Sequence, residues 1–165
     1  MSMTRILKHL LYGRLHVLRC FPAPSMAAIQ AAIAQSEASH MGELRFVVEA
    51  ALDWPDLLRG ITPRERAIEV FSQLRIWDTE HNSGVLVYLL LAERRVEIVA
   101  DRGIHARVGE PGWQAICREM EQAFRAGNFG PGAVAGVARI GALLAQHFPA
   151  QGANRNELSD TPVIL

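Results

Sequence analysis

Two apolar runs on either side of a short polar turn mark the centre of the chain. Residues 84–91 are apolar at nearly every position, which is typical of a central strand buried on both faces. Residues 95–100 form the second run, and the polar pair Glu93 and Arg94 separates the two. We therefore expect an antiparallel hairpin here. Alternating apolar positions at Leu44, Phe46 and Val48 predict another strand before it.

Apolar residues at helical spacing occupy most of the remaining chain. The clearest helix start is residues 62–65, Thr-Pro-Arg-Glu, a capping box with proline in the first turn. Further helices are expected at residues 4–12, 24–39, 111–126 and 129–148. This order predicts a three-layer α/β fold (α-β-α). Its mixed sheet combines a parallel β-α-β unit with the antiparallel hairpin, and helices cover both faces.

The same pattern suggests a division of the chain into three parts. Residues 1–23 are expected to form a helical extension and residues 24–148 the folded domain, while residues 149–165 are polar, lack periodicity and are expected to be disordered. The positions expected to form the core are Phe46, Val48, Phe71, Leu74, Val87, Leu89, Ile98, Ile116, Met120, Phe124, Val137 and Leu144.

Composition and charge narrow the function classes. The 165 residues carry a formal net charge of zero, which argues against a nucleic-acid partner. No apolar run approaches the roughly 20 residues that a transmembrane helix needs, and the N-terminus lacks the uninterrupted apolar stretch of a signal peptide. Cys20 and Cys117 have no metal-type spacing, so we expect reduced thiols and a cytoplasmic protein. The oligomeric state is left open.

Polar residues gather where the strands of the predicted sheet begin or end. In the expected topology, the starts of the first two strands and the end of the third meet at one edge, which we call the rim. Carboxylate and imidazole groups there would suit Ca²⁺, Mg²⁺, Mn²⁺ or Zn²⁺. The candidate metal ligands are Asp78, His81, Asn82 and Asp101. The candidate catalytic residues are His105, Arg102 and His40.

Ordinary structural roles compete with this interpretation. Acids and amides at strand ends commonly satisfy turns, and Asp101 with Arg102 fits a solvated ion pair worth under about 1 kcal/mol. Histidines at positions such as His40 and His105 are more often surface residues than ligands. Convergence of three segments on one rim is what favours a site.

Residues 82–104, with the run Phe-Arg-Ala-Gly-Asn-Phe-Gly-Pro-Gly at 124–132, resemble the TPM-domain family. The resemblance spans roughly residues 25–148 and implies a helix-flanked mixed sheet. Its implications for function are mixed. Some members of the family are acid phosphatases or calcium binders, and others are interaction modules. Two departures concern the site. Asn82-Ser83-Gly84 replaces the usual Asn-Asn-Gly, and residues 103–109 lack the acids that follow the third strand in many members.

Two functions fit these observations. The first is a metal-assisted phosphoester hydrolase, in which the cation polarises the phosphoryl oxygen and activates water. His105 or His40 would donate the proton, and Arg102 would hold the phosphate. The second is a non-catalytic module that binds a metal, or that engages a partner protein through the rim or the N-terminal segment.

Overall fold

A four-stranded mixed sheet forms the centre of the computed structural model, which describes residues 3–152 and 155–165. The strand order is β3-β2-β1-β4, with β1 at Glu43–Glu49, β2 at Gly84–Leu90, β3 at Arg95–Ala100 and β4 at Val163–Ile164. Strands β1 and β2 are parallel, and β3 returns antiparallel to β2 after the short helix η1 (Leu91–Glu93). The predicted fold class, with its parallel unit and its hairpin, is confirmed.

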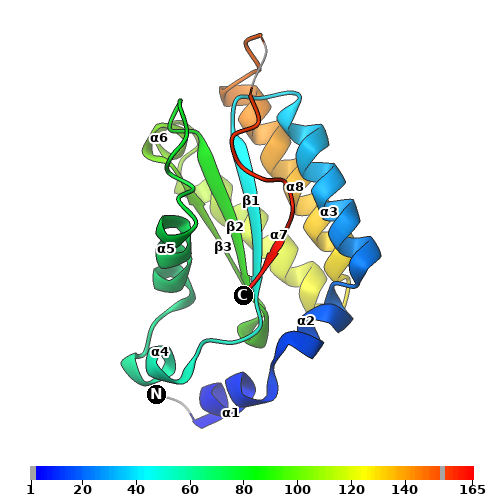
Figure 1. Cartoon of the computed structure of the whole chain (residues 1–165), viewed down its shortest axis with the longest axis vertical. Coiled ribbons are helices and arrows are strands. Elements are labelled where there is room, and N and C mark those ends of the chain that lie inside the picture. Colours follow the sequence, from blue (N-terminus) through cyan, green and yellow to red (C-terminus); the bar gives the residue numbers. More distant parts are fainter. Residues whose placement is uncertain (1–2, 153–154) are drawn as a thin grey trace.

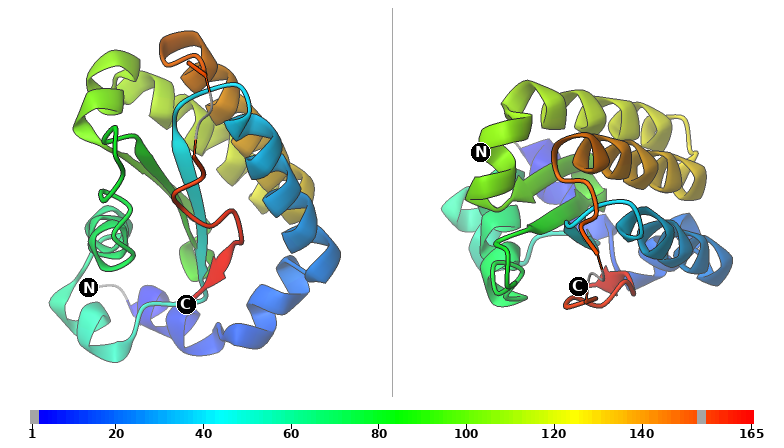
Figure 2. Two further views of the ribbon diagram at one scale, coloured as in Figure 1. Left: turned by 45° about the horizontal axis from the view of Figure 1, so that its top comes forward. Right: turned by 90° about the horizontal axis from the view of Figure 1, so that it is seen from above.

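Helices lie on both faces of this sheet (Figures 1 and 2). Helices α3 (Ala23–Glu37), α7 (Glu110–Arg125) and α8 (Phe129–His147) share a core with the face that carries Phe46 and Val48. Helix α5 (Pro63–Gln73) packs on the opposite face, where Val47 points. Successive side chains of β1 therefore enter different cores, as the two-residue period of a strand requires. Every predicted core residue is buried except Leu74, which is half-buried.

Local signals in the sequence explain where helices begin and end. Thr62 accepts a hydrogen bond from the backbone of Glu65, and the Glu65 carboxylate accepts one from the backbone of Thr62, so the predicted capping box is present. The segment before it forms a short helix, α4 (Trp54–Arg59), which is capped by Asp53. It ends at Gly60, whose φ of 72° favours glycine.

The chain beyond Pro149 departs from the prediction of a disordered tail. Residues Val163–Ile164 form β4 and pair in parallel with Val47 and Val48 of β1. That expectation is therefore wrong for these residues. Val163 and Ile164 gain backbone hydrogen bonds at an open sheet edge, and two residues are too few to show the periodicity of a strand. Residues 153 and 154 of the expected tail lie outside the described residues.

Helices α1 (Met3–Leu11) and α2 (Arg14–Cys20) lie at the same end of the molecule as α4 (Figure 1). No single helix among the described residues has the length and apolar character to cross a membrane. Taken together, α2 and α3 meet these criteria by length and composition alone, with a 70° bend between them. The rim lies at the opposite end, where α6 (Arg102–Val108) follows β3 (Figure 1).

Candidate functional site

The three segments expected at the rim do meet there. Glu43 pairs with Gly84 at the starts of the parallel strands, and Val85 pairs with Ala100 across the hairpin. The backbone N–H of Asp101 donates to the carbonyl of Gly84 at 2.9 Å, which joins the end of β3 to the start of β2. The topology thus brings the backbone of the predicted site together. Whether side chains meet depends on the loops.

Asp78, His81 and Asn82 lie in the loop that precedes β2, and all three are exposed. The Asp78 carboxylate lies 3.1 Å from the guanidinium of Arg75, its partner one turn earlier. Asn82 has a φ of 49°, a left-handed conformation that asparagine tolerates better than most residues. Its backbone carbonyl oxygen lies 4.0 Å from the position that a Cβ on Gly103 would take, so it faces the first turn of α6.

Asp101 precedes the first residue of α6, and its carboxylate is incompletely satisfied. Its Oδ2 atom is buried and has no hydrogen-bond partner among the described residues. Burial raises the pKa of Asp101, while the backbone N–H groups of Gly84 and Arg102 oppose part of that rise. A buried carboxylate oxygen without a donor costs free energy that a bound cation would offset.

His105 and Arg102 lie on α6, the short helix that Asp101 precedes. The backbone N–H of His105 donates to the carbonyl of Asp101 at 2.9 Å, which places the two residues one helical turn apart on one face. The His105 imidazole is half-buried and lies 3.8 Å from the carboxylate of Glu110. Arg102 is exposed.

His40 is held away from the solvent side of the rim. It is fully buried, its Nδ1 accepts a hydrogen bond from the backbone of Gly42 at 3.1 Å, and its Nε2 lies 3.2 Å from the hydroxyl of Ser36. Burial lowers the pKa of His40 to about 4. This imidazole is neutral and enclosed. It is therefore unsuited to the role of proton donor that the sequence suggested for it.

Unsatisfied polar atoms are concentrated at the rim. Within the described residues, four buried side-chain atoms lack a hydrogen-bond partner: Glu43 Oε1, Ser83 Oγ, Asp101 Oδ2 and Trp113 Nε1. The first three come from the start of β1, the start of β2 and the end of β3. No group of three or more His, Cys, Asp or Glu side chains within the described ranges is arranged to hold a metal. The protein atoms at the rim alone would thus form an incomplete ligand set.

Gly84 allows the loop before β2 to pack closely against the start of this strand. The position that a Cβ on Gly84 would occupy lies 2.0 Å from the backbone oxygen of Ile76, a separation that side-chain atoms do not tolerate. The loop before β2 therefore rests directly on the start of the strand. Glycine at this position follows from that close approach.

The C-terminal segment, residues 155–165, covers part of the rim beside β1. Glu43 Oε2 accepts hydrogen bonds from the backbone N–H groups of Glu157 and Leu158, both at 3.1 Å. Behind it, Glu37 Oε1 accepts from the backbone of Leu44 at 2.7 Å. Burial raises the pKa of Glu37 to about 8, and nearby Glu43 and Asp160 add to this rise. Glu37 is therefore protonated at neutral pH, a feature that sequence reasoning missed because the burial of this acid depends on the tertiary structure.

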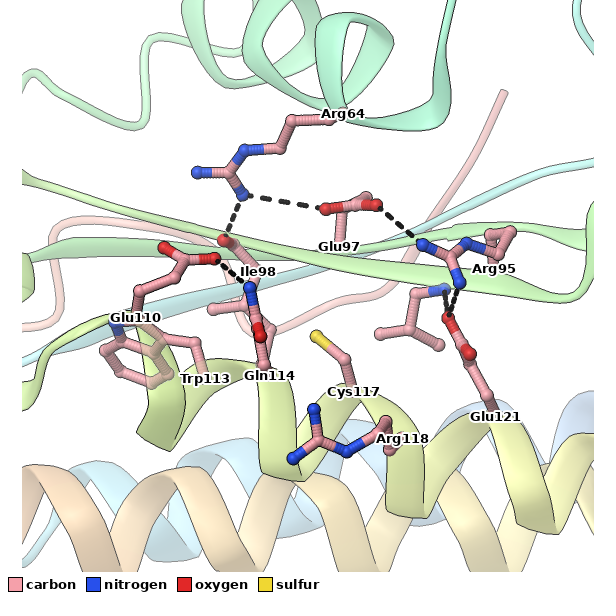
Figure 3. Close-up of a pocket in the computed structure, with 11 residues that line it drawn as sticks. Arg64, Arg95, Glu97, Ile98, Glu110, Trp113, Gln114, Cys117, Arg118 and Glu121 are labelled. Atoms are coloured by element: carbon pink, nitrogen blue, oxygen red, sulfur yellow. Dashed lines mark hydrogen bonds and ion pairs between the residues drawn. The ribbon is translucent and has the colours of Figure 1, made fainter.

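A groove of about 440 Å³ lies along the edge of β3 and between α5 and α7 (Figure 3). Its charged lining consists of Arg64, Arg95, Arg118, Glu97, Glu110 and Glu121. Burial raises the pKa of Cys117, which also lines it, to about 12, so this thiol is not a nucleophile at neutral pH.

Two of these charged side chains bind backbone groups of the exposed edge strand β3. Glu121 accepts a hydrogen bond from the backbone N–H of Val96 at 3.1 Å, and Arg64 donates to the carbonyl of Ile98 at 2.5 Å. Arg95 lies 3.5 Å from Glu121 (Figure 3). Side chains that occupy edge-strand backbone groups discourage pairing with another strand. The groove is therefore a protected sheet edge, and the rim remains the better candidate site.

Comparison with known proteins agrees with this architecture. The sequence model of the TPM domain matches residues 20–143. The solution NMR structure of the BA42 protein from the psychrophilic bacterium Bizionia argentinensis superposes with a TM-score of 0.77. It is 29% identical in sequence, and the match covers 87% of this chain and 94% of that one. No functionally curated protein matches the sequence.

Proposed function

Because the chain belongs to the TPM-domain family, we propose that the rim is its binding site and that Asp101 binds a divalent cation there. The observation that carries the proposal is the buried, unpartnered Oδ2 of Asp101. Glu43 Oε1 and Ser83 Oγ, which are also unpartnered, come from the adjoining segments. A buried polar atom without a hydrogen-bond partner costs stability unless something else contacts it.

The arrangement suits a cation that is only partly coordinated by protein. The backbone oxygen of Asn82 faces the first turn of α6, next to Asp101, and would supply a second oxygen ligand. Mg²⁺ in particular binds through one or two carboxylates, with water and substrate phosphates completing its shell. Asp78 is paired with Arg75 and His81 is exposed, so we assign neither as a primary ligand. The remaining positions go to water and to an anionic ligand.

Hydrolysis of a phosphoester at the same rim is the second candidate function. It is favoured by the placement of His105 one turn after Asp101, with Glu110 at 3.8 Å from the imidazole. In this scheme, the cation polarises the phosphoryl oxygen, His105 donates a proton to the leaving group and Arg102 binds the phosphate. His40 has no part in it, because its ring is buried and occupied.

Thermal unfolding with and without Ca²⁺, Mg²⁺, Mn²⁺ or Zn²⁺ tests the proposal. A cation at 100 times its dissociation constant adds about 2.7 kcal/mol to the free energy of unfolding. For a chain of this size, that increment raises the melting temperature by roughly 5–10 °C. Asp101→Asn should abolish the shift.

Glu80→Gln is the matched control, because Glu80 is an exposed acid in the loop before β2, which also contributes to the rim. It should retain the shift. A shift that survives Asp101→Asn, or the absence of a shift with all four cations, would refute cation binding at Asp101. Hydrolysis of p-nitrophenyl phosphate is measured on the same samples. Cation-dependent turnover that is lost in His105→Asn would favour the hydrolase, whereas a cation shift without turnover would favour the binding module.

A further inference from the structure

Helix α1 is attached to the protein through its polar side. The Arg5 guanidinium lies 2.7 Å from the Glu93 carboxylate and donates to the carbonyl of Ile61 at 2.6 Å. The backbone N–H of Leu52 donates to Nδ1 of His9 at 2.9 Å, so the ring proton is on Nε2, which donates to Glu93 at 2.9 Å. His9 is only 4% exposed. These contacts hold one face of the helix firmly against the core.

The opposite face of α1 is apolar and points into solvent. Leu7, Leu10 and Leu11, which follow the spacing of a single helical stripe, are 58%, 66% and 62% exposed. On α2, Leu15 and Leu18 are 77% and 46% exposed. An ordinary surface helix buries its apolar stripe and exposes its polar one, and α1 does the reverse. Contiguous exposed leucines of this kind mark a surface that contacts an apolar phase or partner.

The charge of this region is equally one-sided. Residues 1–36 contain four Lys and Arg residues and no acid, although the whole chain is electrically neutral. Arg5 is paired with Glu93, whereas Lys8, Arg14 and Arg19 are exposed and form no ion pair with a described residue. Exposed leucines flanked by unpaired basic side chains complement an anionic lipid surface, where each basic residue contributes through the surface potential.

We infer that α1 and α2 form an in-plane membrane-binding surface that recognises anionic lipid. The exposed leucines enter the boundary between headgroups and acyl chains, and Lys8, Arg14 and Arg19 contact the headgroup phosphates. Trp54 on α4, at the same end of the molecule, is 51% exposed and suits the interfacial layer (Figure 1). The rim, at the other end of the strands, faces away from the membrane. This binding is peripheral and reversible.

Co-sedimentation of the full chain with vesicles tests the inference. Binding is expected to mixed phosphatidylcholine–phosphatidylglycerol vesicles at low salt, with much weaker binding to pure phosphatidylcholine and loss at high salt. Leu11→Gln should lower the partition coefficient at least roughly tenfold. The matched control is Ile68→Gln, since Ile68 is 47% exposed on α5 and far from α1 in the sequence. It should bind as the parent does.

Charge reversal provides the second arm. Lys8→Glu combined with Arg14→Glu should weaken binding to the anionic vesicles without changing the melting temperature. No binding at low salt, or equal binding to neutral and anionic vesicles, would overturn the inference. So would a dimer seen by analytical ultracentrifugation that Leu11→Gln dissociates, because a second copy of the chain would then cover the leucines.

Discussion

Replacement of Glu37 by glutamine should change how the stability of the protein depends on pH. Glu37 is 9% exposed, and burial with the help of Glu43 and Asp160 raises its pKa from 4.5 to about 8. The folded protein therefore keeps a proton that the unfolded chain has released. Between pH 4.5 and 8, this difference lowers the free energy of unfolding as pH rises.

His40 acts in the opposite sense over part of that range. Its pKa falls from 6.5 to about 4 on folding, so between pH 4 and 6.5 the unfolded chain binds the additional proton and stability rises with pH. The two effects largely cancel up to pH 6.5. Above pH 6.5, the effect of Glu37 is no longer offset by that of His40. Over the 1.5 pH units from pH 6.5 to 8, the free energy of unfolding should therefore fall by about 2 kcal/mol.

Urea unfolding followed by tryptophan fluorescence measures this loss. The parent protein should lose about 2 kcal/mol between pH 6.5 and 8. Glu37→Gln should show no such loss, because the amide still accepts the Leu44 hydrogen bond and does not titrate. The control Glu119→Gln, a change at an exposed acid on α7, should follow the parent. Parallel profiles for the parent and Glu37→Gln would refute the assignment of a protonated Glu37.

Three further substitutions test the packing by urea unfolding. Gly84→Ala should cost about 3 kcal/mol or more, because the new Cβ would lie 2.0 Å from the Ile76 oxygen; a loss below about 1 kcal/mol would show that the loop moves freely. Phe71→Ala, at a position 9% exposed, should cost roughly 3–5 kcal/mol, and a much smaller loss would contradict a closed core there. Tyr88→Phe removes a 2.6 Å hydrogen bond to Glu49 and should cost about 1–2 kcal/mol, whereas a neutral result would mean that water replaces the hydroxyl.

Periodicity and capping signals were sufficient to predict the sheet. The doubly apolar run of β2 could only be a central strand, and the capping box of α5 fixed the crossover between β1 and β2. The parallel and antiparallel pairings followed from these two features and from the short turn at Glu93 and Arg94. The ends of the strands, and therefore the rim, could be located for the same reason.

Side-chain directions at the rim could not be predicted in the same way. Periodicity gives the faces of strands and helices, but His40 and Asp78 lie in connections whose backbone dihedrals the pattern does not determine. His40 consequently turns inward toward Ser36. Asp78 forms an ion pair with Arg75 and does not join Asp101 in a common metal site. Of the predicted ligands, Asp101 at the end of a strand has the buried, unsatisfied carboxylate oxygen.

The long-range pairing of the short strand β4 could not be predicted from the sequence either. Two residues of β4 carry no recognisable period, yet they add a strand to β1. Their pairing brings Asp160 close to Glu37, and the neighbouring backbone of Glu157 and Leu158 binds Glu43. The unusual protonation of Glu37 is thus a consequence of tertiary structure. It has no counterpart in the local sequence around either acid.

Paramagnetic broadening by Mn²⁺ tests the central claim, cation binding at the rim, most directly. In ¹H–¹⁵N spectra of the full chain, substoichiometric Mn²⁺ should selectively broaden the backbone amides of Asn82, Ser83, Gly84, Arg102 and Gly103. Competition with Mg²⁺ should restore these signals, and Asp101→Asn should remove the effect. Broadening that is centred elsewhere, or that persists in Asp101→Asn, would contradict the proposed site.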